Sequence, residues 1–143
     1  MKIIYIKLFL RVSVATGFIS AVADRFGLWP KEKSAWGTWD SFLEYTKLLN
    51  PWAPEFMTNS IGLIATLAEI ILAFFLLIGF KTALSARISG VLLLIFGVTM
   101  TFTLGIKAPL DYSVFSASAA AFGLSLIKEQ YLEIDQLFKK EIS

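Results

Sequence analysis

The chain has 143 residues, of which 57% are hydrophobic and 17% charged, and its mean hydropathy is +0.71. Because soluble domains are about 45–50% apolar and about 25% charged, this composition predicts an integral membrane protein. The sequence has no cysteine or histidine, so no disulfide, iron–sulfur, zinc or His-ligated haem site is expected. The net charge is +2, and no run of basic residues interleaved with aromatic ones indicates nucleic-acid binding.

The first apolar segment covers residues 3–23 and is interrupted by Lys7 and Arg11. Its end, Ala21-Val22-Ala23, matches a signal-peptidase pattern, but Arg11 breaks the apolar core of such a signal, so we expect an uncleaved membrane helix.

The loop at residues 24–57 holds all four tryptophans, Trp29, Trp36, Trp39 and Trp52. Indole rings prefer the headgroup region of a membrane. The helical spacing of apolar residues in 38–49 predicts a short amphipathic helix that ends before Pro51 and covers the outer end of the bundle.

Three more apolar segments follow, at residues 58–80, 84–104 and 110–127, and a charged tail occupies 128–143. A membrane helix needs roughly 20 apolar residues, and the last segment only just reaches that length. The expected fold is therefore an all-α membrane protein, a four-transmembrane-helix bundle, forming one domain over residues 1–143.

The distribution of Lys and Arg predicts the orientation, because short cytoplasmic loops carry more of them. One side would hold eight (Lys2, Lys7, Arg11, Lys81, Arg87, Lys128, Lys139 and Lys140) and the other five (Arg25, Lys31, Lys33, Lys47 and Lys107). We therefore expect both termini in the cytoplasm.

Small residues recur at four-residue intervals in three of the segments, a pattern that lets helices approach closely in a bilayer. The predicted packing ridges are Ser13-Gly17-Ala21, Gly97-Thr101-Gly105 and Ser113-Ala117-Ala121.

Two charges lie inside the predicted membrane segments, and a charge at the bilayer centre costs about 2.5–3.5 kcal/mol unless it finds a partner. Arg11 lies roughly 12 Å into the first segment at 1.5 Å per residue, and Glu69 lies near the middle of the second. We therefore predict an Arg11–Glu69 contact, which would either fix the helix register or bind the polar group of a ligand.

A second set of charges is expected at the outer face: Asp24, Arg25, Lys107 and Asp111. Such residues either anchor the bundle in solvent or form an outward-facing polar mouth beneath the Trp-rich loop.

The sequence resembles the DoxX-like family of small bacterial membrane proteins. The resemblance covers about residues 10–127 and rests on Leu10-Arg11, Ala23-Asp24-Arg25-Phe26-Gly27-Leu28-Trp29, Ala35-Trp36-Gly37-Thr38-Trp39, Ala68-Glu69 and Gly79-Phe80. It implies a four-helix bundle in the bacterial cytoplasmic (inner) membrane, with some relatives linked to quinone-dependent oxidation of sulfur compounds. It also implies Arg11, Glu69, Asp24, Arg25 and Trp36 as candidate ligand-binding positions, and no catalytic residue.

Three functions fit these features. The first is a small subunit that binds a lipophilic ligand such as a quinone and works with a partner protein carrying a redox centre, or as a homo-oligomer; the others are a non-catalytic structural or assembly subunit and a small-solute permease. In the first, Arg11 and Glu69 would bind the polar head, and phenylalanines would pack on the ring: Phe18, Phe74, Phe75 and Phe96.

Overall fold

A computed structural model describes residues 2–140, in which every regular element is helical. The helices are α1 (Ile3–Arg25), α2 (Trp39–Leu49), the 3-10 turn η1 (Glu55–Met57), α3 (Thr58–Ile78), α4 (Thr82–Leu104), α5 (Lys107–Asp111), α6 (Val114–Leu126) and α7 (Asp135–Lys140). The last three residues of the predicted tail, 141–143, lie outside the described residues.

Three of these helices, α1, α3 with its preceding turn, and α4, are long and apolar enough to cross a membrane. Their bounds lie within about two residues of the segments expected from hydropathy. The predicted single helix at residues 110–127 is wrong in detail: Ser113 takes a left-handed conformation (φ 56°) that separates α5 from α6. The apolar helix that remains, α6, has 13 residues.

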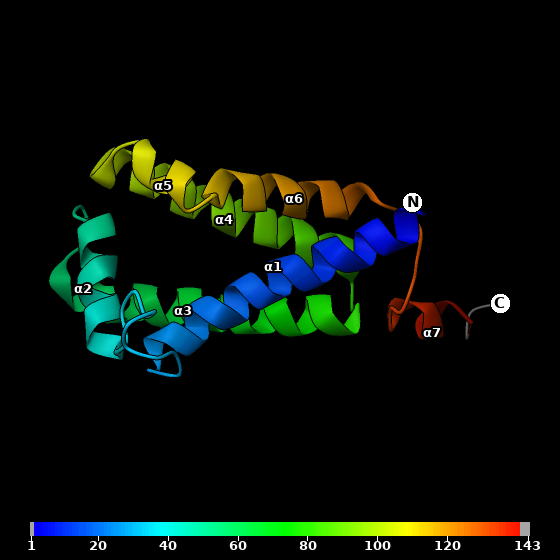
Figure 1. The fold of residues 1–143 in the computed structure, drawn as a ribbon, viewed down its shortest axis with the longest axis horizontal. Coiled ribbons are helices and arrows are strands. Elements are labelled where there is room, and N and C mark those ends of the chain that lie inside the picture. Colours follow the sequence, from blue (N-terminus) through cyan, green and yellow to red (C-terminus); the bar gives the residue numbers. More distant parts are fainter. Residues whose placement is uncertain (1, 141–143) are drawn as a thin grey trace.

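The helices pack in two layers, α1 against α3 and α4 against α6 (Figure 1). The short helix α2 lies across the end of the bundle opposite the chain termini, and α7 lies at the other end (Figure 1). We call these the cap end and the tail end. The predicted amphipathic helix is therefore present as α2, with Thr38 as its N-cap accepting a hydrogen bond from the Ser41 N–H at 3.2 Å.

The α4–α6 contact is close because α4 presents two glycines to two phenylalanines of α6. A Cβ atom at Gly90 would lie 2.9 Å from the Phe122 ring, and one at Gly97 would lie 2.7 Å from the Phe115 ring. Ser118 also donates a hydrogen bond to the Gly90 carbonyl at 2.7 Å. Gly97 of the predicted ridge is therefore at a packing interface, as small residues in membrane helices tend to be.

The ridge predicted on α1 is wrong. Ser13 and Gly17 are exposed, and a Cβ added to Gly17 would meet nothing within 4 Å. The buried apolar face of α1 consists of Val14, Ala15 and Phe18. The four-residue spacing of small side chains did not mark the packed face here, because larger residues fill the space between α1 and α3.

Candidate functional site

The predicted contact between Arg11 and Glu69 does not form. Arg11 instead donates from Nε to the Leu76 carbonyl at 2.9 Å, and Leu76 follows Glu69 by seven residues, about 10 Å along the helix axis. The side chains of a helix tilt toward its N-terminus, so Arg11 reaches back to the end of α3 rather than toward the midplane. Two separate clusters result, one around each arginine of α1.

The Arg25 cluster lies toward the cap end and consists of Arg25, Glu69, Thr66, Phe42 and Trp36. Nη2 of Arg25 lies 2.9 Å from Oε1 and 2.7 Å from Oε2 of Glu69, and the two side chains are only 3% and 2% exposed. Nη1 donates to Thr66 Oγ1 at 2.6 Å, and that hydroxyl donates to the Gly62 carbonyl at 2.8 Å. Arg25, expected at a solvated outer face, is thus the buried partner of Glu69.

Aromatic rings cover the guanidinium of Arg25. Its Cζ lies 4.0 Å from the centroid of the Phe42 ring and 5.5 Å from that of Trp36, both within cation–π range. Glycine at position 62 allows this arrangement, because a Cβ there would lie 2.8 Å from Leu43 and 3.2 Å from Phe42. Gly62 therefore lets α2 pack closely against α3, with the Phe42 ring over the guanidinium of Arg25.

Asp24 fixes the loop that carries Trp36. Its Oδ2 accepts hydrogen bonds from the backbone N–H groups of Ala35 at 2.9 Å and Trp36 at 3.0 Å, and its Oδ1 accepts one from the Ser34 hydroxyl. Asp24 is therefore a positioning residue for the Arg25 cluster. Of the five candidate residues, four meet here: Asp24, Arg25, Trp36 and Glu69.

Tyr45 extends the aromatic cover, with its ring 5.7 Å from that of Trp36. Burial, together with the neighbouring phenol of Tyr112, raises the pKa of the Tyr45 phenol above its ordinary value, so this group stays neutral. Lys107 and Asp111, expected to join the same polar group, form their own exposed ion pair one helical turn apart.

The Arg11 cluster closes the tail end. The guanidinium of Arg11 donates to the carbonyls of Leu76 at 2.9 Å and Leu77 at 3.0 Å on α3, and to those of Tyr131 at 2.9 Å and Leu132 at 3.0 Å in the tail. The last carbonyls of a helix have no partner within it and carry the negative end of its dipole. Arg11, 1% exposed, therefore joins the end of α3 to the tail.

The tail itself is held by acidic side chains. Glu133 is 5% exposed, and its Oε1 lies 2.7 Å from Lys7 Nζ and 3.7 Å from Arg11 Nη1. Asp135 accepts hydrogen bonds from the N–H groups of Lys81 at 2.7 Å and Thr82 at 3.0 Å, and so caps the start of α4. The tail predicted as a charged extension instead folds onto the bundle through residue 135.

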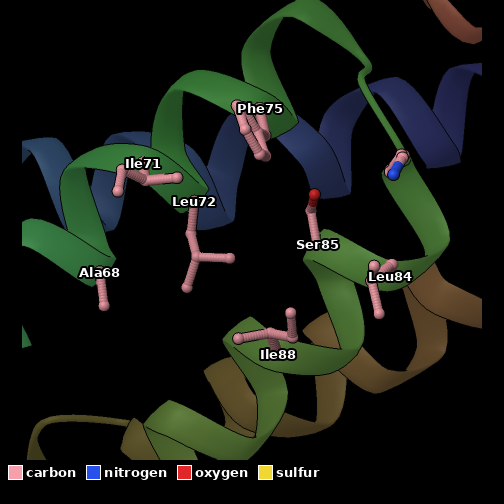
Figure 2. A pocket seen from close by; sticks show the side chains of 8 residues that line it. Ala68, Ile71, Leu72, Phe75, Leu84, Ser85 and Ile88 are labelled. Carbon is pink, nitrogen blue, oxygen red and sulfur yellow. The ribbon is translucent and has the colours of Figure 1, made fainter.

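A groove of about 250 Å³ lies between α3 and α4. Its walls are apolar apart from two residues near the α3–α4 turn, and the lining residues are Ala68, Ile71, Leu72, Phe75, Lys81, Leu84, Ser85 and Ile88. Figure 2 shows the labelled side chains of both helices converging on this space. Neither Arg11 nor Glu69 lines it, and of the four candidate phenylalanines only Phe75 does.

Sequence reasoning missed Thr66, Phe42 and Gly62, which complete the Arg25 cluster. Thr66 precedes Glu69 by three residues and therefore shares its helix face, a signal the sequence does contain. The approach of Phe42 depends on how α2 folds over the bundle, which helical spacing alone does not determine. Within residues 2–140, no group of His, Cys, Asp or Glu is arranged to hold a metal ion.

No protein-family model, curated protein or solved structure matches this chain.

Proposed function

We propose that this chain is a DoxX-like protein of the bacterial inner membrane, with both termini in the cytoplasm and with α5 and α6 together forming a fourth crossing. The register of the α4–α6 contact supports this, because Gly90 meets Phe122 and Gly97 meets Phe115. If this antiparallel pairing continues in both directions, residues 107–126 lie alongside most of α4. Since α4 is itself long enough to span, its antiparallel partner covers a similar depth.

Within that membrane, we propose that the protein is a small subunit that binds a lipophilic ligand, a quinone being the class we favour. The observation that carries this proposal is the α3–α4 groove, whose surface is apolar and which ends beside Lys81 and Ser85 at the α3–α4 turn. An isoprenoid chain matches the apolar walls. The polar head would lie near Lys81, whose ammonium is a hydrogen-bond donor. The Ser85 hydroxyl beside it already donates to the Phe80 carbonyl at 3.1 Å.

We place the ligand in the groove and not at Arg11 and Glu69, because those two side chains already have partners within the chain. Arg11 donates to four backbone carbonyls, and Glu69 is held by Arg25. A chain without cysteine or histidine has few means of holding a redox centre. We therefore propose that a partner protein, or a complex around this subunit, carries the electrons to or from the quinone.

The test is mass spectrometry of what the protein retains after purification in native lipid. Ala68→Phe would fill the groove, and we expect it to lower the amount of retained quinone at least ten-fold relative to wild type. Ile64→Phe adds the same ring on an outward-facing position of α3, 67% exposed, and should leave the amount unchanged. Equal quinone in wild type and Ala68→Phe would refute binding in the groove.

A structural or assembly subunit is the second candidate, and a specific observation favours it. Both arginines have polar partners within the chain, so neither needs a ligand to balance its charge: Arg25 has Glu69 and Thr66, and Arg11 has Glu133 and the carbonyls of α3 and the tail. Wild-type protein that retains no quinone but co-purifies with a defined membrane partner would support this candidate.

A small-solute permease, the third candidate, would need a polar path between the two faces of the membrane. In the described part of the chain, the two charged clusters lie toward opposite ends of α1, which gives this candidate the least support.

A further inference from the structure

A second cavity, of about 410 Å³, lies at the tail end of the bundle, outside both the groove and the Arg25 cluster. The start of α4, the segment that follows α6 and the folded tail all contribute to it. Its charged lining residues are Lys7, Arg87, Lys128, Glu133 and Asp135, and the buried hydroxyls of Thr82 and Ser125 also line it. Unlike the α3–α4 groove, this cavity is lined by charge.

The two acidic groups of the cavity already have partners within the chain. Glu133 Oε1 lies 2.7 Å from Lys7 Nζ, and the Asp135 carboxylate accepts the N–H groups of Lys81 and Thr82. Lys7 is itself used in this way and is 4% exposed. The charges of Lys7 and Glu133 therefore cancel, which leaves the Asp135 carboxylate as one negative charge against the two positive charges of Arg87 and Lys128.

Two charged residues of the cavity have no partner among the described residues, and both are positive. Arg87 and Lys128 are exposed, and neither side chain has a hydrogen bond or ion pair among residues 2–137. The side chain of Thr82 supplies a further, independent observation: it is 2% exposed, and its Oγ1 has no hydrogen-bond partner in the described part of the chain. A buried hydroxyl without a partner is costly, and a ligand oxygen would satisfy it.

We infer that this cavity binds the phosphate group of an anionic phospholipid headgroup. Residues near the start of α1 and of α4 line the cavity, and the tail that also lines it is hydrogen-bonded to the end of α3 through Ile134 N–H and the Ile78 carbonyl. Three helices that could cross a membrane therefore have their ends near it. Basic pockets between membrane helices at that depth bind anionic headgroups. Arg87 contacts phosphate oxygens through its planar fork, Lys128 contributes a point charge and the Thr82 hydroxyl donates one hydrogen bond.

The test compares lipid binding by native mass spectrometry on delipidated protein, with dioleoylphosphatidylglycerol and dioleoylphosphatidylcholine as probes. Each basic side chain near an anionic headgroup contributes roughly a five-fold preference, so Arg87→Gln with Lys128→Gln should lower phosphatidylglycerol binding about 30-fold. Phosphatidylcholine binding should change little. Both side chains are exposed and have no hydrogen bond or ion pair among residues 2–137, so the double variant should fold, and its circular dichroism spectrum checks this.

Lys31→Gln with Lys33→Gln is the matched control, because it removes two exposed positive charges from the loop between α1 and α2. It should bind phosphatidylglycerol as wild type does. Thr82→Val should weaken phosphatidylglycerol binding about five-fold without any change in charge.

Competition with added inorganic phosphate distinguishes a lipid headgroup from a soluble phosphate as the ligand. Displacement of phosphatidylglycerol only at concentrations far above those of the lipid supports a lipid headgroup as the ligand. Tight binding of inorganic phosphate that depends on Arg87 and Lys128 supports the site but assigns it to a soluble phosphate. Equal phosphatidylglycerol binding by wild type and the Arg87/Lys128 double variant would overturn the inference, and so would an equal loss in the Lys31/Lys33 control.

Discussion

Replacing Glu69 with leucine should strongly destabilise the protein, because it leaves the Arg25 guanidinium buried without its counter-ion. Both side chains are at most 3% exposed, and Nη2 lies within 3 Å of both carboxylate oxygens. Removing one partner of a buried pair costs about 3–5 kcal/mol. Because Arg25 keeps its hydrogen bond to Thr66 and its contact with Phe42, we expect a loss near the lower end, about 3 kcal/mol.

The double variant Arg25→Met with Glu69→Leu tests whether that loss comes from the unpaired charge. Apolar replacement of both members of a buried pair is often neutral or stabilising, so the double variant should recover to within about 1 kcal/mol of wild type. The assay is reversible unfolding in mixed micelles by sodium dodecyl sulfate, followed by circular dichroism.

The exposed Lys107–Asp111 pair provides the control for this cycle. Asp111→Asn should cost at most about 0.5 kcal/mol, as exposed pairs one helical turn apart contribute little. A loss below about 1 kcal/mol for Glu69→Leu, or a double variant no more stable than that single variant, would refute the assignment of this pair.

Three further outcomes follow from the same contacts. Arg11→Met should release the tail, because four carbonyls lose their donor, and limited proteolysis should then cleave near residues 128–135 at least ten-fold faster than in wild type. Gly97→Val should destabilise the protein by about 1–3 kcal/mol through overpacking against Phe115, whereas Gly123→Ala, with open space around it, should change the micelle unfolding midpoint little. Asp135→Ala should cost about 1 kcal/mol in the same assay by removing the cap of α4.

Each of these outcomes can fail. Unchanged proteolysis of Arg11→Met would mean that other contacts hold the tail. Equal unfolding midpoints for the Gly97→Val and Gly123→Ala variants would contradict the close α4–α6 approach. If Asp135→Ala is as stable as wild type, the backbone hydrogen bonds of the tail, such as Ile134 N–H to the Ile78 carbonyl at 3.0 Å, are enough to hold the tail on the bundle.

Hydropathy and helical spacing were enough to predict α1, α3, α4 and the capping helix α2. They succeed because a membrane helix must satisfy its backbone hydrogen bonds internally and present apolar side chains over a fixed length, both of which are local properties. The break at Ser113 was missed because it lies only three residues into the predicted segment, where Asp111 and Tyr112 were grouped with the apolar residues that follow. A left-handed serine has no clear mark in the sequence.

Four candidate residues, Asp24, Arg25, Trp36 and Glu69, do lie together, but the pairing of Glu69 with Arg25 was not predicted. Counting residues along each segment placed Arg11 and Glu69 at similar depths, but it ignored that a long side chain reaches back by about a turn toward the N-terminus of its helix. The same effect carries Arg25 inward from the end of α1 to Glu69. The folding of the tail onto Arg11 involves residues more than a hundred positions apart, which no local pattern reports.

The number of membrane crossings is the central claim, and labelling of single cysteines tests it most directly, since the chain has no cysteine of its own. The positions are Lys33, Ile106 and Lys128, all exposed. With four crossings, a membrane-impermeant maleimide should label Lys33→Cys and Ile106→Cys in intact cells, and Lys128→Cys only after permeabilisation. Labelling of Lys128→Cys from the same side as Ile106→Cys would contradict the account, because α5 and α6 would then not cross the bilayer.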